Sequence, residues 1–95
     1  MREVAIKMLS SRFDEAVTFA RELHRSQHRK GAPVPYLSHL LAVASLVIED
    51  GGTEDEAIAA LLHDAIEDQG DTYPGGRPGL RRDITERFGA RVLFI

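Results

Sequence analysis

The chain has 95 residues, of which 43% are hydrophobic, enough for one small domain with a core of its own. Its 12 basic and 15 acidic residues give a net charge of −3, which argues against a nucleic-acid-binding surface. The lack of cysteine excludes disulfides, thiolate nucleophiles and cysteine-ligated zinc. No apolar run approaches the roughly 18 residues of a membrane span, and residues 1–11 lack a signal-peptide pattern, so we expect a soluble protein of the cytoplasm.

The N-terminal third predicts two helices. The first spans about residues 2–9. Ser11 is then expected to cap a second helix from Arg12 to about Gln27. The apolar residues of this second helix recur every three or four positions, as a single buried face requires: Phe13, Ala16, Val17, Ala20 and Leu23. Glycine and prolines make residues 29–37 a loop.

The middle of the chain predicts two further helices. Ser38 is expected to cap a third helix, which runs from His39 to about Asp50 and ends at a pair of glycines. Thr53 and Glu56 have the spacing of a capping box, and they open a fourth helix from Glu54 to about Glu67.

Glycine and proline recur between residues 68 and 79, which predicts a loop. A fifth helix is expected from Pro78 or Gly79 to Phe88, and residues 90–95 look like the start of a sixth. This makes the fold all-α, a bundle of five to six helices with short connections. Because the final residues are apolar and no cap follows them, we expect the bundle to be incomplete at its C-terminus.

The fourth helix carries the most informative polar residues. Its first half is apolar on nearly all sides, which is typical of a central, buried helix. Its second half then presents His63, Asp64, Glu67 and Asp68, and buried groups of these types are costly unless they are paired or bind a metal. Antiparallel packing of the third and fourth helices would bring His39 close to His63 and Asp64. These three side chains could share one cation.

More ordinary interpretations exist for the same residues. His39 could cap the start of its helix, and His63 with Asp64 could be a polar pair satisfied within the fold. Two histidines and one carboxylate also suit ferrous oxygenases. The acidic pair one turn after His63, and a basic cluster elsewhere in the chain, favour phosphate chemistry instead.

The basic cluster consists of Arg25, His28, Arg29 and Lys30. It could be a solvated helix end, where cations suit the helix dipole. It could equally be an anion clamp, since guanidinium and ammonium groups suit phosphate. His24, near the end of the second helix, is expected to pack or hydrogen-bond locally.

Three ordered motifs carry a family resemblance: residues 24–31, Pro35 to His39, and Leu61 to Asp68. Together they resemble the HD-domain metal-dependent phosphohydrolases, in the branch of the Rel/Spo-type (p)ppGpp hydrolases and their small stand-alone relatives. The resemblance extends from about Phe13 to Val92 and implies that residues 1–95 are the N-terminal portion of a single HD-type domain.

The resemblance implies one divalent cation, usually Mn²⁺, and hydrolysis of a nucleotide phosphate ester such as the 3′-pyrophosphate of (p)ppGpp. The partner would be a small phosphorylated molecule, with no nucleic acid and no membrane. Three groups of residues are implicated: the metal ligands His39, His63 and Asp64, the catalytic pair Glu67 and Asp68, and the substrate-binding pair Arg29 and Lys30.

Two departures from the family pattern keep an alternative open. The connection from Gly31 to Tyr36 is longer than in the (p)ppGpp hydrolases. The last metal ligand of the family is an aspartate on a later helix, and Asp71 and Asp83 sit in the wrong element to replace it. The alternative is an inactive, truncated HD-domain remnant that acts at most as a binding module.

Overall fold

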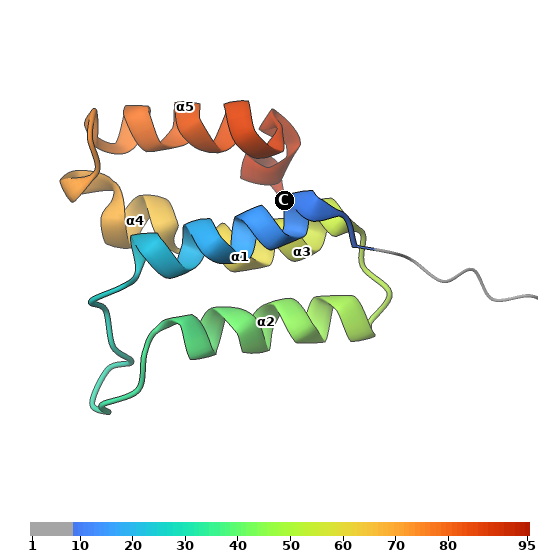
Figure 1. The fold of residues 1–95 in the computed structure, drawn as a ribbon, viewed down its shortest axis with the longest axis horizontal. Helices are drawn as coiled ribbons and strands as arrows, with labels where there is room; N and C mark the ends of the chain where they lie inside the picture. The colour runs from blue at the N-terminus through green and yellow to red at the C-terminus, as the bar shows by residue number, and fades with distance from the viewer. Residues whose placement is uncertain (1–8) are drawn as a thin grey trace, which may run out of the picture.

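The computed structural model describes residues 9–95, and all the regular elements in this part of the chain are helices (Figure 1). Its α-helices are α1 (Ser11–Leu23), α2 (Leu37–Glu49), α3 (Glu54–Leu62), α4 (Ala65–Gln69) and α5 (Gly76–Phe88). Two 3₁₀ helices complete it, η1 (Gly70–Thr72) and η2 (Ala90–Phe94). The all-α prediction is therefore confirmed. The helix expected over residues 2–9 lies outside the described part, apart from its last residue.

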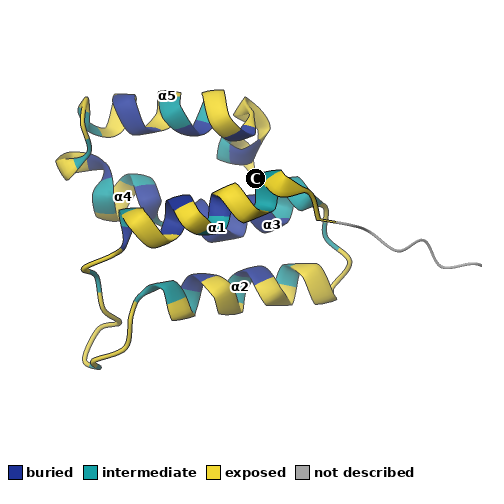
Figure 2. Ribbon diagram, viewed as in Figure 1, coloured by how far each residue is buried: buried dark blue, intermediate teal, exposed yellow. Residues whose placement is uncertain are grey.

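Helix α3 is the centre of the bundle. It packs against α1, α2 and η2, and α2 and α5 lie on opposite sides of the pair formed by α1 and α3 (Figure 1). Every residue from Ala57 to Leu62 is buried, as the apolar first half of this segment predicts (Figure 2). The largest fully buried side chains of the core are Leu40, Ile58, Leu61, Leu80 and Ile84. No helix between residues 9 and 95 combines the length and the apolar character that crossing a bilayer requires.

Helix α1 begins and ends earlier than expected. Ser10, not Ser11, is its N-cap, because the extended backbone of Ser10 lets its hydroxyl accept the Arg12 N–H at 3.2 Å. The helix ends at Leu23 rather than near Gln27, and His24 is its C-cap. The chain turns there because the Gln27 N–H bonds to the His24 carbonyl at 2.9 Å.

The prediction that Ser38 caps the third helix is wrong. Helix α2 already includes Ser38, and its N-cap is Tyr36, whose side chain makes no capping hydrogen bond. Tyr36 has helical backbone angles (φ −60°, ψ −27°), so the turn after Pro35 winds directly into the helix. The capping box of α3 is confirmed, since Thr53 Oγ1 accepts the Glu56 N–H and Glu56 Oε1 accepts the Thr53 N–H.

The expected fourth helix is broken in two at His63 and Asp64. Helix α3 ends at Leu62, and Asp64 (φ −96°, ψ −4°) is the N-cap of α4. The chain leaves the core at this break, so His63 is exposed rather than buried as predicted.

The last helices also differ in their bounds. Helix α5 begins at Gly76, before Pro78. Pro78 is compatible with this start, because it lies in the first turn, where no backbone N–H is needed. Gly75 precedes the helix with φ 86°, a left-handed conformation that favours glycine. The segment after Gly89 is the 3₁₀ helix η2 and not the start of an α-helix.

Candidate metal centre

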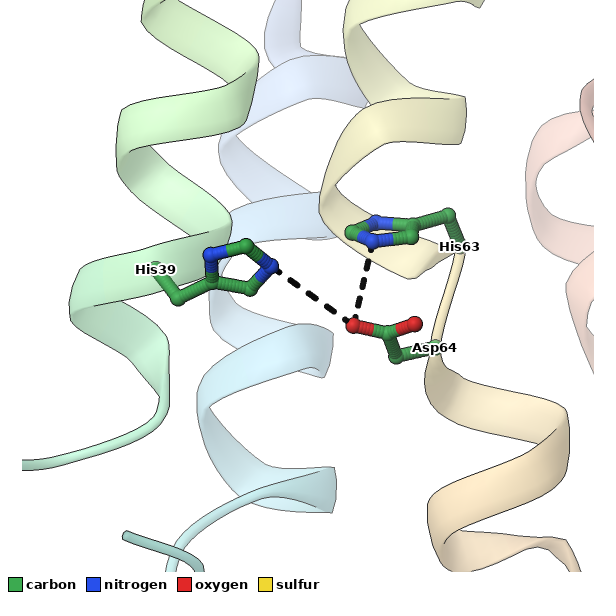
Figure 3. A group of neighbouring side chains, drawn as sticks. All are labelled: His39, His63 and Asp64. Atoms are coloured by element: carbon green, nitrogen blue, oxygen red, sulfur yellow. Dashed lines mark ion pairs between the residues drawn. The ribbon is translucent and has the colours of Figure 1, made fainter. Parts of the chain in front are cut away.

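The break between α3 and α4 lies beside the first turn of α2. This places His39 of α2 next to His63 and Asp64, and Figure 3 shows the three side chains converging. The expected antiparallel packing of the two predicted helices is therefore what brings these residues together. His39 and Asp64 are partly buried and His63 is exposed, so the group is accessible to solvent.

The distances within this group suit a shared cation. The Nε2 atoms of His63 and His39 lie 3.0 Å and 3.8 Å from Asp64 Oδ2. All three candidate ligand atoms lie within 4.8 Å of one another. Metal–ligand bonds of about 2.1 Å separate two ligand atoms by at most about 4.2 Å, so small side-chain rotations suffice to close the group around one ion. Two imidazoles and one carboxylate suit a divalent transition metal.

The orientation of His63 leaves the correct nitrogen available. Its Nδ1 lies 2.7 Å from the carbonyl oxygen of Ala60, one of the last carbonyls of α3 that lack a helical partner. Because a carbonyl only accepts, Nδ1 carries a hydrogen in this contact. The end of α3 therefore holds the ring so that Nε2, the nitrogen left to bind a metal, faces Asp64.

Asp64 has a partner that the sequence did not single out. The hydroxyl of Tyr36 donates to Asp64 Oδ2. Burial, together with this carboxylate, raises the pKa of Tyr36 to about 12, so the hydroxyl remains a donor at neutral pH. A carboxylate oxygen has two lone pairs, and Oδ2 can accept this hydrogen bond while it faces the histidines. The sequence signal that could have indicated Tyr36 was its position three residues before His39, at the start of α2.

The acidic pair that follows Asp64 lies on α4. Glu67 and Asp68 are both exposed, in contrast to the buried carboxylates expected from the sequence. The Asp68 backbone N–H bonds to the Asp64 carbonyl at 2.9 Å, so the two aspartates are one helical turn apart. Asp68 Oδ2 accepts a hydrogen bond from Gln27 Nε2 at 3.0 Å, which orients its carboxylate.

The basic pair lies in the loop between α1 and α2. The Arg29 N–H bonds to the Val34 carbonyl at 2.8 Å, and the Tyr36 N–H bonds to the Gln27 carbonyl at 2.8 Å, so Arg29 lies in a segment whose backbone pairs with the one that leads to Tyr36. Lys30 is exposed in the same loop. The aspartates Asp71 and Asp83 pair instead with Arg77 and Tyr73, away from the three candidate ligands.

Comparison with known families decides the ancestry of the chain. Residues 16–95 match the family model described as HD domain. The chain belongs to the HD-domain family. The family resemblance drawn from the three motifs is thereby confirmed.

Relatives of this HD domain are named for one shared activity. The chain is 45% identical to guanosine-3′,5′-bis(diphosphate) 3′-pyrophosphohydrolase MESH1 of Xenopus tropicalis over 84 residues, which are 85% of this chain and 42% of that protein. It is 42% identical over 80 residues to the guanosine-3′,5′-bis(diphosphate) 3′-pyrophosphohydrolase of Aquifex aeolicus, covering 84% of this chain and 10% of that protein. The chain thus spans less than half the length of either relative.

A third relative is named for two activities. The bifunctional (p)ppGpp synthase/hydrolase RelA of Mycobacterium tuberculosis is 41% identical over 69 residues, which are 73% of this chain and 9% of that protein. The matched region lies in proteins of very different length, and hydrolysis is the activity common to the names of all three.

Proposed function

We propose that this HD domain is a metal-dependent phosphohydrolase domain that acts on a nucleotide phosphate ester, such as the 3′-pyrophosphate of (p)ppGpp. The observation that carries the proposal is the convergence of His39, His63 and Asp64, whose candidate ligand atoms lie within 4.8 Å of one another. The names of the relatives support the substrate class, since each refers to hydrolysis of a guanosine polyphosphate.

In this proposal the three converging residues hold one divalent cation, with Mn²⁺ as the first choice. The cation would supply Lewis-acid activation of a water molecule and would offset the negative charge of the phosphates. Tyr36 fixes the carboxylate of Asp64, and the Ala60 carbonyl fixes the ring of His63, so two of the three ligands are oriented before any ion binds.

The acidic pair performs the proton transfer in this scheme. Water attacks the phosphorus atom, the bond to the ribose 3′ oxygen breaks, and one proton passes from the water to the leaving oxygen. Glu67 and Asp68 are exposed one turn beyond Asp64, where they can accept that proton and return it. Asp68 is held in place by Gln27, and Glu67 is exposed beside it.

The basic pair binds the anionic substrate. Arg29 lies in the segment whose backbone pairs with the one that leads to Tyr36, and Lys30 follows it in the same exposed loop. Guanidinium and ammonium groups suit phosphate oxygens, so this loop would hold the nucleotide beside the metal centre.

The direct test is release of pyrophosphate from ppGpp by the purified protein, with and without Mn²⁺. We expect Mn²⁺-dependent turnover that Asp64→Asn abolishes. Asp83→Asn is the matched control, because Asp83 also accepts a hydrogen bond from a tyrosine hydroxyl, but on α5. If the protein binds Mn²⁺ yet releases no pyrophosphate, even when extended to the natural end of the domain, the hydrolase assignment fails and the alternative of a binding module takes its place.

A further inference from the structure

His24 is the one buried polar residue among residues 9–95. Its side chain is 2% exposed, and its Nε2 atom is buried without a hydrogen-bond partner. An unsatisfied buried polar atom costs about 1–3 kcal/mol, so an apolar side chain would suit this position better if packing were its only task. The other ring nitrogen, Nδ1, must therefore explain why this position holds a histidine.

The Nδ1 atom of His24 is the start of a chain of hydrogen bonds. It lies 2.6 Å from Gln27 Oε1, and Gln27 Nε2 lies 3.0 Å from Asp68 Oδ2. The carboxylate of Asp68 only accepts, so Gln27 must present its NH₂ group to Asp68 and its oxygen to His24. It follows that His24 Nδ1 donates and that Nε2 carries the unused lone pair.

Gln27 is held at its backbone as well as at its side chain. Its N–H bonds to the His24 carbonyl at 2.9 Å, and its carbonyl accepts the Tyr36 N–H at 2.8 Å. Gln69 Nε2 also donates to Gln27 Oε1, at 2.7 Å. Gln69 is only partly buried, whereas His24 is buried, so His24 is the better-packed support of the amide.

The ring of His24 supports a second path. It packs on the Tyr36 ring with centroids 5.2 Å apart and planes tilted by 31°. The centroids of the Tyr36 and His39 rings are 5.4 Å apart, and those of the His39 and His63 rings are 5.7 Å apart. A column of four rings thus runs from the core to the candidate metal ligands, and Tyr36 in this column is the donor to Asp64.

We propose that His24 is a positioning residue for this site. Its Nδ1–H fixes the Gln27 amide and through it the carboxylate of Asp68, while its ring supports Tyr36 and through it Asp64. The effect on hydrolysis rests on the proposed function, but the two structural paths do not. Neither path brings His24 into contact with substrate or metal, so it acts only through other residues.

Two substitutions separate the paths. His24→Phe keeps a ring against Tyr36 and removes the donor to Gln27. We expect kcat for ppGpp hydrolysis to fall about tenfold, the low end of the effect of such supporting residues, with Mn²⁺ affinity unchanged. His24→Asn keeps an N–H donor near the Nδ1 position and removes the ring. We expect its Mn²⁺ affinity to fall, with kcat at saturating Mn²⁺ close to that of the wild type. A merely structural role would change both quantities in parallel in both variants, and that result would overturn the proposal.

A double-mutant cycle tests the path through Asp68. In an Asp68→Asn background, His24→Phe should lower kcat no further, because its partner's carboxylate is already gone. Independent, multiplicative losses would contradict the proposal. Tyr73→Phe is the control, since it removes a partly buried tyrosine–aspartate hydrogen bond that involves neither His24 nor Gln27, and it should change neither kcat nor Mn²⁺ affinity.

A measurement without turnover separates this proposal from the proposed function. Nitrogen-15 NMR of the histidine rings at neutral pH should show His24 with its hydrogen on Nδ1, and His24→Phe should shift the side-chain amide signal of Gln27. If the wild type hydrolyses nothing, the proposed function fails, and this spectrum still decides the role of His24. A hydrogen on Nε2 alone, or an unshifted Gln27 amide, would overturn it.

Discussion

Removing the hydroxyl of Tyr36 is the most informative single change at the candidate metal centre. The hydroxyl donates to Asp64 Oδ2, and the ring packs between those of His24 and His39. Tyr36→Phe removes the hydrogen bond and retains both ring contacts. It therefore changes the orientation of the Asp64 carboxylate while it leaves the packing at the start of α2 in place.

The size of the effect follows from the chemistry of this hydrogen bond. Hydrogen bonds to charged groups contribute about 1.5–3 kcal/mol, and each 1.4 kcal/mol is a tenfold change in an equilibrium constant. The side chain of Asp64 is 26% exposed, so water replaces part of what is lost. We expect the low end of the range, which is a loss of about tenfold in Mn²⁺ affinity.

The assay is calorimetric titration of Mn²⁺ into the wild type, Tyr36→Phe and the matched control Tyr73→Phe. Tyr73 also donates its hydroxyl to an aspartate, Asp83, at 2.5 Å, and its ring also packs in the core, against Phe19. The control should bind Mn²⁺ like the wild type. Equal or tighter binding by Tyr36→Phe would refute the claim that Tyr36 orients a metal ligand.

Two further predictions concern stability. The pKa of Glu54 is lowered by the hydrogen bond from the Ser10 N–H and, further, by the Ser10 hydroxyl and Arg12, which lies 3.0 Å away. Because the pKa of Glu54 is lower in the folded protein, its ionised form stabilises the fold at pH values above the ordinary pKa of 4.5. This contribution is lost as the pH falls through the pKa of the folded state. Glu54→Gln should therefore lower the free energy of unfolding by about 1 kcal/mol or less at pH 7, and the difference from the wild type should shrink below about pH 4.5 in urea titrations. A difference that grows on acidification would contradict this assignment. Leu61→Ala should lower the free energy of unfolding by about 3 kcal/mol in the same titrations, because Leu61 is fully buried in α3. Leu46→Ala should change it little, because the side chain of Leu46 is 65% exposed. Similar losses in the two leucine variants would show that α3 is not the centre of the core.

Local sequence patterns predicted the parts of the fold that local interactions determine. The capping box of Thr53 and Glu56 and the buried stretch from Ala57 to Leu62 depend on residues within two turns of each other, and both are present. The break at His63 and Asp64 was missed, because nothing in the spacing of apolar residues distinguishes one bent helix from two. The cap of α1 was misplaced by one residue, since adjacent serines are equivalent in sequence and only the bonds of Ser10 to Glu54 on another helix distinguish them.

The candidate site was predictable to a similar extent. The position of His39 beside His63 and Asp64 followed from antiparallel packing of neighbouring helices. The supporting roles of Tyr36 and Gln27 did not, because their hydrogen bonds join residues 28 and 41 positions apart in the chain. Contacts of this kind depend on how the loop between α1 and α2 folds back on α4, which no local pattern encodes.

Metal binding by the Asp64→Asn variant tests the central claim most directly. Inductively coupled plasma analysis after equilibration with Mn²⁺ and gel filtration would give the metal content of the wild type, Asp64→Asn and the control Asp83→Asn. The three-residue centre predicts close to one Mn²⁺ per chain in the wild type and in Asp83→Asn, and a near-complete loss in Asp64→Asn. A metal-free wild type, or equal metal content in all three proteins, would contradict it.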